Sequence, residues 1–189
     1  MIKFEDAYKS LGPRCCMWRE KVQNLYNEIL KMPSEGAMAE IGVYQGATSR
    51  LLRLLHPYRE LYCYDTFCGI KNSDPTTDFH KDGEMVCSLD DVKSFVGSEN
   101  TQYRVGIFPE SFAEHDIRFS FVHSDTDTYF GTKATLDIMY SRLVYNGILM
   151  FDDYNWNKCL GVKQAIEEWS IGKELHTRVY KNQFVLIKY

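Results

Sequence analysis

The chain has 189 residues, of which 44% are hydrophobic and 25% are charged, and its formal net charge is −4. This length favours one domain with a sizeable core, and this composition excludes an intrinsically disordered chain. The lack of a basic stripe argues against a nucleic-acid partner. No apolar run approaches the roughly 18 residues that span a bilayer, so no membrane partner is expected.

The N-terminal stretch "MIKFEDAYKS" has no apolar segment of the kind found in secretory signals. The six cysteines show neither a CxxC motif nor a metal-ligand spacing. Free thiols are typical of reducing compartments, so we expect a cytoplasmic protein without disulfides. Cys15 and Cys16 are neighbours, and packing in an amphipathic segment is favoured over redox reactivity for this pair.

The first half of the chain predicts two helices, two strands and a long loop. Apolar spacing and Pro or Gly stops indicate a helix, a strand, a helix and a strand, at residues 18–31, 37–43, 47–55 and 61–65. Residues 68–87 are rich in Gly, Asp, Thr and Pro. Long loops in compact domains are usually functional or disordered, so this segment is a candidate lid.

In the second half, helices and strands alternate until a final pair of strands. These elements are expected at residues 88–96, 103–108, 118–124, 132–143, 147–151, 160–170 and 177–189. The alternation predicts an α/β fold with a doubly wound, mainly parallel seven-stranded sheet and a C-terminal antiparallel hairpin. We expect residues 37–189 to form this domain and residues 1–36 to add a helical segment to it.

The turn after the first predicted strand, "AEIGVYQG", indicates a ligand site. In open α/β sheets ligands bind at the carboxyl ends of strands, and Gly42 and Gly46 would let a ligand approach the backbone. Glu40 would repel an anion but not a cation, and Asp65, ending the next strand, could accept hydrogen bonds from ribose hydroxyls. A cationic nucleoside without phosphate fits, and S-adenosylmethionine is such a molecule. The alternative is an ordinary turn with incidental acids.

Four carboxylates follow two other predicted strands. Asp125 and Asp127 come after "FVHS", and Asp152 and Asp153 come after "ILMF". The carboxyl ends of these strands lie on the ligand side of a doubly wound sheet, and a hard divalent cation such as Mg²⁺ is the simplest partner for converging carboxylates. The alternative is helix capping, with Asp127 capping the helix expected near Thr132.

The motifs "EIGVYQG", "YDTFCGI", "HSDTDTYFGTK" and "FDDYNW…GVKQAIEEW" together resemble the macrocin O-methyltransferase family over about residues 37–169. That family consists of class I, Rossmann-like enzymes that depend on S-adenosylmethionine and Mg²⁺ and methylate sugar hydroxyls in antibiotic biosynthesis. The resemblance implies that residues 37–189 form an S-adenosylmethionine-dependent methyltransferase domain. The chain has fewer than forty residues before its first strand, where such sugar methyltransferases have a longer lid region.

The resemblance also implies roles for individual residues. The metal-binding acids of the family fall on Asp125, Asp152 and Asp153. Asp127 matches the proposed general base, and His80 is the nearest match to a histidine that some relatives place over the acceptor. The donor-binding positions fall on Glu40, Gly42 and Asp65, with Thr66 and Phe67 beside them. For His80 the alternative is an exposed loop histidine.

The expected function is therefore transfer of a methyl group from S-adenosylmethionine to a hydroxyl of a sugar or another small molecule, assisted by a divalent metal (class EC 2.1.1). The predicted helix at residues 18–31 could support a homo-oligomer. Two alternatives stay open. The "DTD" sequence would also suit a metal-dependent glycosyltransferase, and a non-catalytic domain could bind the donor alone.

Overall fold

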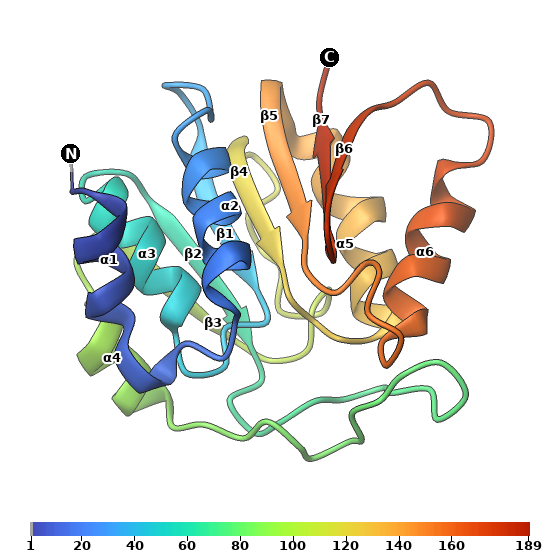
Figure 1. Cartoon of the computed structure of the whole chain (residues 1–189), viewed down its shortest axis with the longest axis horizontal. Helices are drawn as coiled ribbons and strands as arrows, with labels where there is room; N and C mark the ends of the chain where they lie inside the picture. The colour runs from blue at the N-terminus through green and yellow to red at the C-terminus, as the bar shows by residue number, and fades with distance from the viewer. Residues whose placement is uncertain (1) are drawn as a thin grey trace.

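Residues 2–189 are described by a computed structural model in which helices and strands alternate along most of the chain (Figure 1). The helices are α1 (Phe4–Leu11), α2 (Arg19–Ile29), α3 (Ala47–Leu55), α4 (Leu89–Val96), α5 (Tyr129–Arg142) and α6 (Leu160–Ser170), with a short 3-10 turn at Gly12–Arg14. The strands are β1 (Ala37–Ile41), β2 (Leu61–Asp65), β3 (Thr101–Val105), β4 (Phe119–Ser124), β5 (Leu143–Phe151), β6 (His176–Tyr180) and β7 (Gln183–Ile187). Helix α1 was not predicted, because its eight residues are too few for a periodic pattern.

The seven strands form one sheet with the order β3-β2-β1-β4-β5-β7-β6. β1 to β5 are parallel, and β7 is antiparallel to both β5 and β6. The predicted doubly wound sheet with an antiparallel C-terminal hairpin is therefore confirmed. The strand order reverses between β1 and β4, where Ile41 pairs with Ser124. Ligands of open α/β sheets bind at such a switch point.

The two faces of the sheet are covered by different helices, because side chains alternate along a strand. On β5, Ile148 and Met150 belong to the core shared with α1 to α4, whereas Leu149 and Phe151 belong to the core shared with α5 and α6. This alternation places Asp152, the residue after β5, on the side of the sheet covered by α2.

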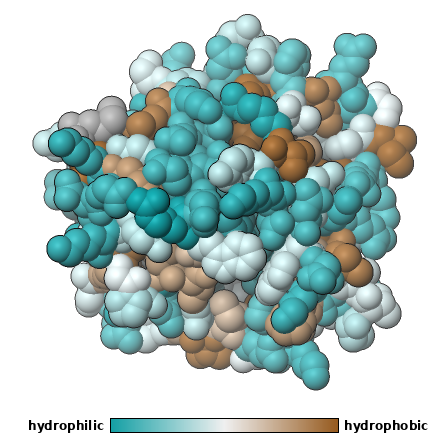
Figure 2. Space-filling model, in the orientation of Figure 1, coloured by the Kyte–Doolittle hydropathy of each residue, from teal (hydrophilic) through white to brown (hydrophobic). Residues whose placement is uncertain are grey.

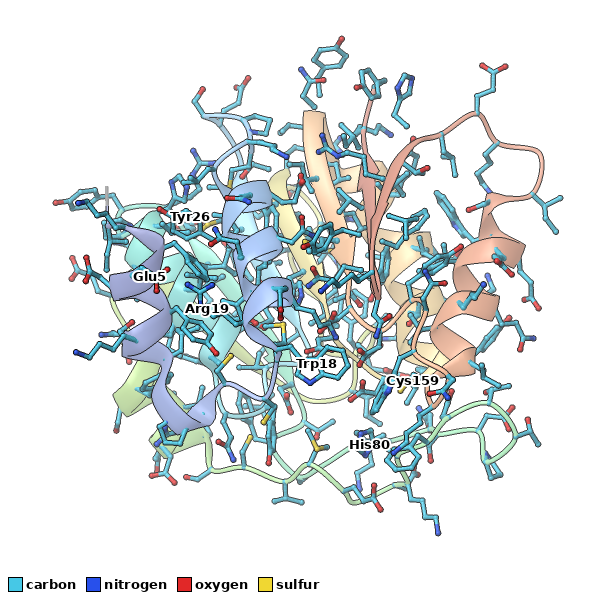
Figure 3. The ribbon with its side chains drawn as sticks, in the orientation of Figure 1. Glu5, Trp18, Arg19, Tyr26, His80 and Cys159 are labelled. Carbon is cyan, nitrogen blue, oxygen red and sulfur yellow. The ribbon has the colours of Figure 1, made fainter. Side chains whose placement is uncertain are left out.

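The N-terminal helices pack on each other and on the sheet (Figures 1 and 3). Arg19 forms an ion pair with Glu5, and its guanidinium lies over the Phe4 ring at 5.0 Å. The Tyr26 hydroxyl donates a hydrogen bond to the carbonyl oxygen of Ile2 at 2.8 Å. Leu25 is fully buried in the core that also contains Met38 of β1.

We propose that residues 2–36 and 37–189 are one folding unit, and Leu25→Ala tests this. The cavity left in the shared core should lower the free energy of unfolding by about 2–5 kcal/mol, within a single transition in urea. Leu160→Ala, at a half-exposed leucine of α6, is the control and should change stability by no more than about 0.5 kcal/mol. Two separate unfolding transitions followed by circular dichroism would contradict the proposal.

Within residues 2–189, no helix is both long enough and apolar enough to cross a membrane. The face drawn in Figure 2 is mostly hydrophilic, with apolar residues scattered over it in small groups.

Candidate active site

Two connected cavities lie at the carboxyl ends of the parallel strands. The glycine-loop cavity contains about 1020 Å³ of empty space, part of it open to solvent, and is lined by the turn after β1 and by the ends of β2, β3 and β4. The acid cavity encloses about 660 Å³ and is lined by the residues that follow β4 and β5. The residues that line both cavities are Cys16, Met17, Met85, Asp125 and Asp127.

The two glycines of the first turn have different tasks. Gly42 has φ +84°, and a Cβ atom there would lie 2.0 Å from the backbone oxygen of Asp125, so no side chain fits between the ends of β1 and β4. Gly46 has φ +83°, but a Cβ atom there would meet Val96 of α4 at 2.8 Å. Gly42 lines the glycine-loop cavity and Gly46 does not. The absence of a side chain at Gly46 thus allows the start of α3 to pack closely against α4.

Asp65 shapes the glycine-loop cavity. One carboxylate oxygen accepts hydrogen bonds from the backbone N–H groups of Val43 (2.7 Å) and Tyr44 (2.9 Å), and the other accepts one from Phe67 (2.7 Å). Asp65 and Thr66 line the cavity, whereas the Phe67 side chain is buried in the core beside it. Because a carboxylate has about four acceptor positions, Asp65 can still receive a ribose hydroxyl.

Glu40 forms the buried floor of the same cavity. Its carboxylate accepts a hydrogen bond from the Ser49 hydroxyl and lies 3.5 Å from Nδ1 of His123, which is fully buried on β4. Burial alone would lower the pKa of His123, but Glu40 and Asp125 raise it above its ordinary value. Glu40 therefore lies beside a buried imidazole and also lines the glycine-loop cavity.

The four predicted acids converge, and we call Asp125, Asp127, Asp152 and Asp153 the acid cluster. One carboxylate oxygen each of Asp125, Asp152 and Asp153 lies within 4.8 Å of the others. The strand ladder places them there, because the N–H of Asp152 donates to the carbonyl oxygen of Ser124 at 3.0 Å. Asp127 and Asp153 both have φ 58°, a left-handed conformation that aspartate tolerates better than most residues.

Capping does not explain Asp127. Helix α5 begins at Tyr129, three residues before the predicted start, and Thr128 is its cap. The Thr128 side chain accepts a hydrogen bond from the N–H of Gly131 at 3.1 Å. The capping alternative for Asp127 was therefore wrong, and its carboxylate is available to the two cavities.

The acid cluster contains more negative charge than its neighbours neutralise. Burial, and after it the neighbouring carboxylates, raise the pKa of Asp125, Asp127 and Asp152 above the usual range. Three close carboxylate oxygens are the ligands that Mg²⁺ prefers, and the residues present fit such an ion.

A lysine that the sequence analysis missed contacts this cluster. Nζ of Lys21, on α2, lies 2.7 Å from Oδ1 of Asp152 and 2.7 Å from Oδ1 of Asp153. Burial alone would lower the pKa of Lys21, but Asp152, Asp153 and Asp125 raise it. One signal could have revealed it: Lys21 is three residues after Trp18 and four before Leu25, on the apolar stripe of its helix.

The long loop lies across the carboxyl ends of the strands, along the bottom of Figure 1. It is attached to the neighbouring helices, because Asp78 accepts a hydrogen bond from the N–H of Tyr129 at 3.2 Å. His80 lines the acid cavity together with Trp18 and Trp156. Figure 3 labels His80 and Trp18. Nδ1 of His80 is 3.0 Å from Glu84, which leaves Nε2 for a ligand.

The two aromatic residues after the paired aspartates have different surroundings. Trp156 lines the acid cavity and packs against Phe79, with ring centroids 5.9 Å apart. Tyr154 packs on Phe184 at 5.0 Å. Trp156 is therefore part of the cavity wall, while Tyr154 supports the hairpin.

The fold and the cavity at the β1/β4 switch point define the class of protein. The glycine-loop cavity offers close backbone approach at Gly42, a carboxylate at Asp65 and apolar surface at Ile107 and Phe108, and this combination fits a nucleoside. A seven-stranded sheet in which only β7 runs antiparallel to its neighbours is the architecture of class I, S-adenosylmethionine-dependent methyltransferases.

The family follows from the sequence. The profile of the macrocin-O-methyltransferase (TylF) family matches residues 15–184, so the chain belongs to this family of O-methyltransferases. This membership sets aside the glycosyltransferase alternative. No curated protein sequence matches the chain.

Solved structures share the fold at low identity. The O-methyltransferase NovP has a TM-score of 0.70 and 20% identity, covering 90% of this chain and 80% of its own. The calicheamicin methyltransferase CalS11 has a TM-score of 0.72 and 18% identity, covering 97% and 90%. A putative caffeoyl-CoA O-methyltransferase from Staphylococcus aureus has a TM-score of 0.70 and 12% identity, covering 100% and 93%.

Proposed function

We propose that the protein transfers the methyl group of S-adenosylmethionine to a hydroxyl of a small molecule, and that a sugar is the acceptor to test first. One observation supports this most directly: Asp125 and Asp127 line both cavities, so a donor in one and an acceptor in the other would meet there. The sugar is suggested by CalS11, which is described as a TDP-rhamnose 3′-O-methyltransferase, and by the family as a whole.

The donor would occupy the glycine-loop cavity. Asp65 would hold the ribose, Thr66 and the backbone at Gly42 would contact the nucleoside, and the acidic surroundings of Glu40 would favour a cationic ligand. Gly46 and Phe67, which do not line this cavity, would act by positioning the loop and the core beside it.

The metal site would consist of Asp125, Asp152 and Asp153. A bound Mg²⁺ supplies a Lewis acid that lowers the pKa of a hydroxyl placed against it. The carboxylates would keep the acceptor hydroxyl positioned toward the methyl group of the donor. Methyl transfer depends mainly on such positioning of the two reactants.

Asp127 is the better placed of the two candidate bases. It lines both cavities, so it lies where a donor in one and an acceptor in the other would meet. Asp127 would take the hydroxyl proton while the acceptor oxygen takes the methyl group. His80 lines the acid cavity alone, and its free Nε2 would contact the acceptor.

Titration of S-adenosylhomocysteine in a calorimeter, with Mg²⁺ and again with EDTA, tests the donor site. Micromolar binding in both conditions is expected, because two of the three proposed metal ligands, Asp152 and Asp153, line the acid cavity alone. Asp65→Asn should weaken this binding by about 10- to 100-fold, since hydrogen bonds to a charged group contribute about 1.5–3 kcal/mol. Asp116→Asn, at an exposed aspartate, is the control. Absence of binding to the unaltered protein would exclude the proposal, and binding without methyl transfer to any acceptor would favour a non-catalytic domain.

We further propose that the protein works in a reducing, cytoplasm-like compartment. All six cysteines are free thiols, among them Cys16, which lines both cavities. The apolar side of α2 is buried in the chain's own core, so a homo-oligomer would have to use another surface.

A further inference from the structure

We propose that Lys21 is a built-in competitor for the divalent cation, and that its ammonium must leave Asp152 and Asp153 when the cation binds. The inference rests on the proposed cation site and assigns a role to a residue of the N-terminal segment. Lys21 would thereby lower the affinity of this site for the cation. Binding of the cation would also move the segment that precedes α2 and lines the cavities.

Geometry supports the competition. The ammonium nitrogen of Lys21 lies 2.7 Å from one oxygen each of Asp152 and Asp153. Mg²⁺ binds carboxylate oxygens at about 2.0–2.1 Å, so an ion on the same oxygens would lie against the ammonium. Two close positive charges in a buried site repel strongly, and the side chains of Lys21 and Asp152 are 9% and 2% exposed.

The ammonium of Lys21 does not pair with all four carboxylates of the acid cluster, so a divalent cation could form additional favourable interactions with them. Lys21 donates a hydrogen bond to Asp153, but its contact with Asp152 is an ion pair without hydrogen-bond geometry. Asp125 and Asp127 have no contact of this kind with Lys21 among the ion pairs of residues 2–189. The ammonium of Lys21 thus contacts two of the four carboxylates with a single charge, whereas a divalent ion carries two charges.

Displacement of Lys21 would also move the nearby segment of the chain that lines the acid cavity. Lys21 is in the first turn of α2, three residues after Trp18, which lines the acid cavity together with Cys16 and Met17. Trp18 is 65% exposed, whereas Met17 packs on the core and Arg19 pairs with Glu5. Because linkage is reciprocal, whatever moves this segment would also change the affinity for the cation.

Titration of Mn²⁺ alone into the folded protein, without donor or acceptor, tests the inference. Lys21→Met removes the competing charge and keeps a long apolar side chain, so the affinity for Mn²⁺ should rise by at least about tenfold. Lys31→Met is the matched control. It removes the same charge just beyond the other end of α2, at an exposed lysine that pairs with Glu28, and should change the affinity by less than about twofold.

A second measurement uses the unaltered protein, in case Lys21→Met does not fold. The rate at which an amine-specific reagent labels Lys21, followed by peptide mass spectrometry, should rise at least about fivefold when Mn²⁺ replaces EDTA. Labelling of Lys31 should stay constant.

Equal or weaker Mn²⁺ affinity in folded Lys21→Met, or unchanged labelling of Lys21 while Mn²⁺ is bound, would overturn the inference. Failure of both proteins to bind Mn²⁺ would overturn it too. Binding of S-adenosylhomocysteine, measured separately, shows whether the methyltransferase proposal fails with it.

Discussion

Replacing Asp152 by alanine should lower the rate of methyl transfer by about 10²- to 10³-fold or more and leave the affinity for S-adenosylhomocysteine within about threefold. Asp152 is buried at the end of β5 and lines the acid cavity but not the glycine-loop cavity. Its loss removes a carboxylate from the acceptor side without touching the donor side. Transfer of a labelled methyl group and calorimetric titration measure the two effects independently.

The control for this variant is Asp137→Ala, at an exposed aspartate of α5 that pairs with Lys133 at 3.0 Å. It removes the same charge from the surface and should change neither quantity. Full activity of Asp152→Ala in EDTA would refute the proposed role of the acid cluster. Loss of donor affinity equal to the loss of rate would instead point to a damaged fold.

Replacing Gly42 by alanine should lower the free energy of unfolding by about 4 kcal/mol or more, a range reached by few single substitutions. The new Cβ atom would lie 2.0 Å from the backbone oxygen of Asp125, at a residue with φ +84°. Neither atom can move aside cheaply, because β1 and β4 are paired up to Ile41 and Ser124. Urea unfolding measures the loss.

Gly172→Ala separates the two causes of the expected loss of stability in Gly42→Ala, which are the steric clash of the Cβ atom and the backbone strain at positive φ. Gly172 also has a positive φ, +72°, but an added Cβ atom would find nothing within 4 Å. This variant therefore isolates the backbone strain, which should be about 1–2 kcal/mol. Equal losses in the two variants would mean that the ends of β1 and β4 do not approach each other as described.

Most of the fold could be predicted from the sequence because local patterns specify it. Apolar periodicity located every strand and every helix except α1 and the short 3-10 turn, and the alternation of elements predicted the parallel sheet. The predicted ends of helices and strands were less accurate where a change of backbone conformation ends the element. β1 ends at Ile41 rather than at residue 43, because Gly42 leaves the extended conformation.

The convergence of the four aspartates could also be predicted, since parallel strands place their carboxyl ends at one edge of the sheet. The role of Gly46 could not, because its neighbour Val96 comes from a helix fifty residues further along the chain. Likewise, nothing local reveals that Glu40 lies beside His123, which approaches it only when β1 and β4 pair.

Lys21 shows most clearly which contacts could not be predicted from the sequence. Two adjacent aspartates after a buried strand require a positive partner, and the sequence suggested a metal ion. The partner that the structure provides is a lysine 132 positions away from Asp153. Side-chain alternation on β5 directs Asp152 toward α2, and the packing of α2 on that face brings Lys21 into contact. Such a contact depends on how the sheet and its helices pack, so no local pattern of residues predicts it.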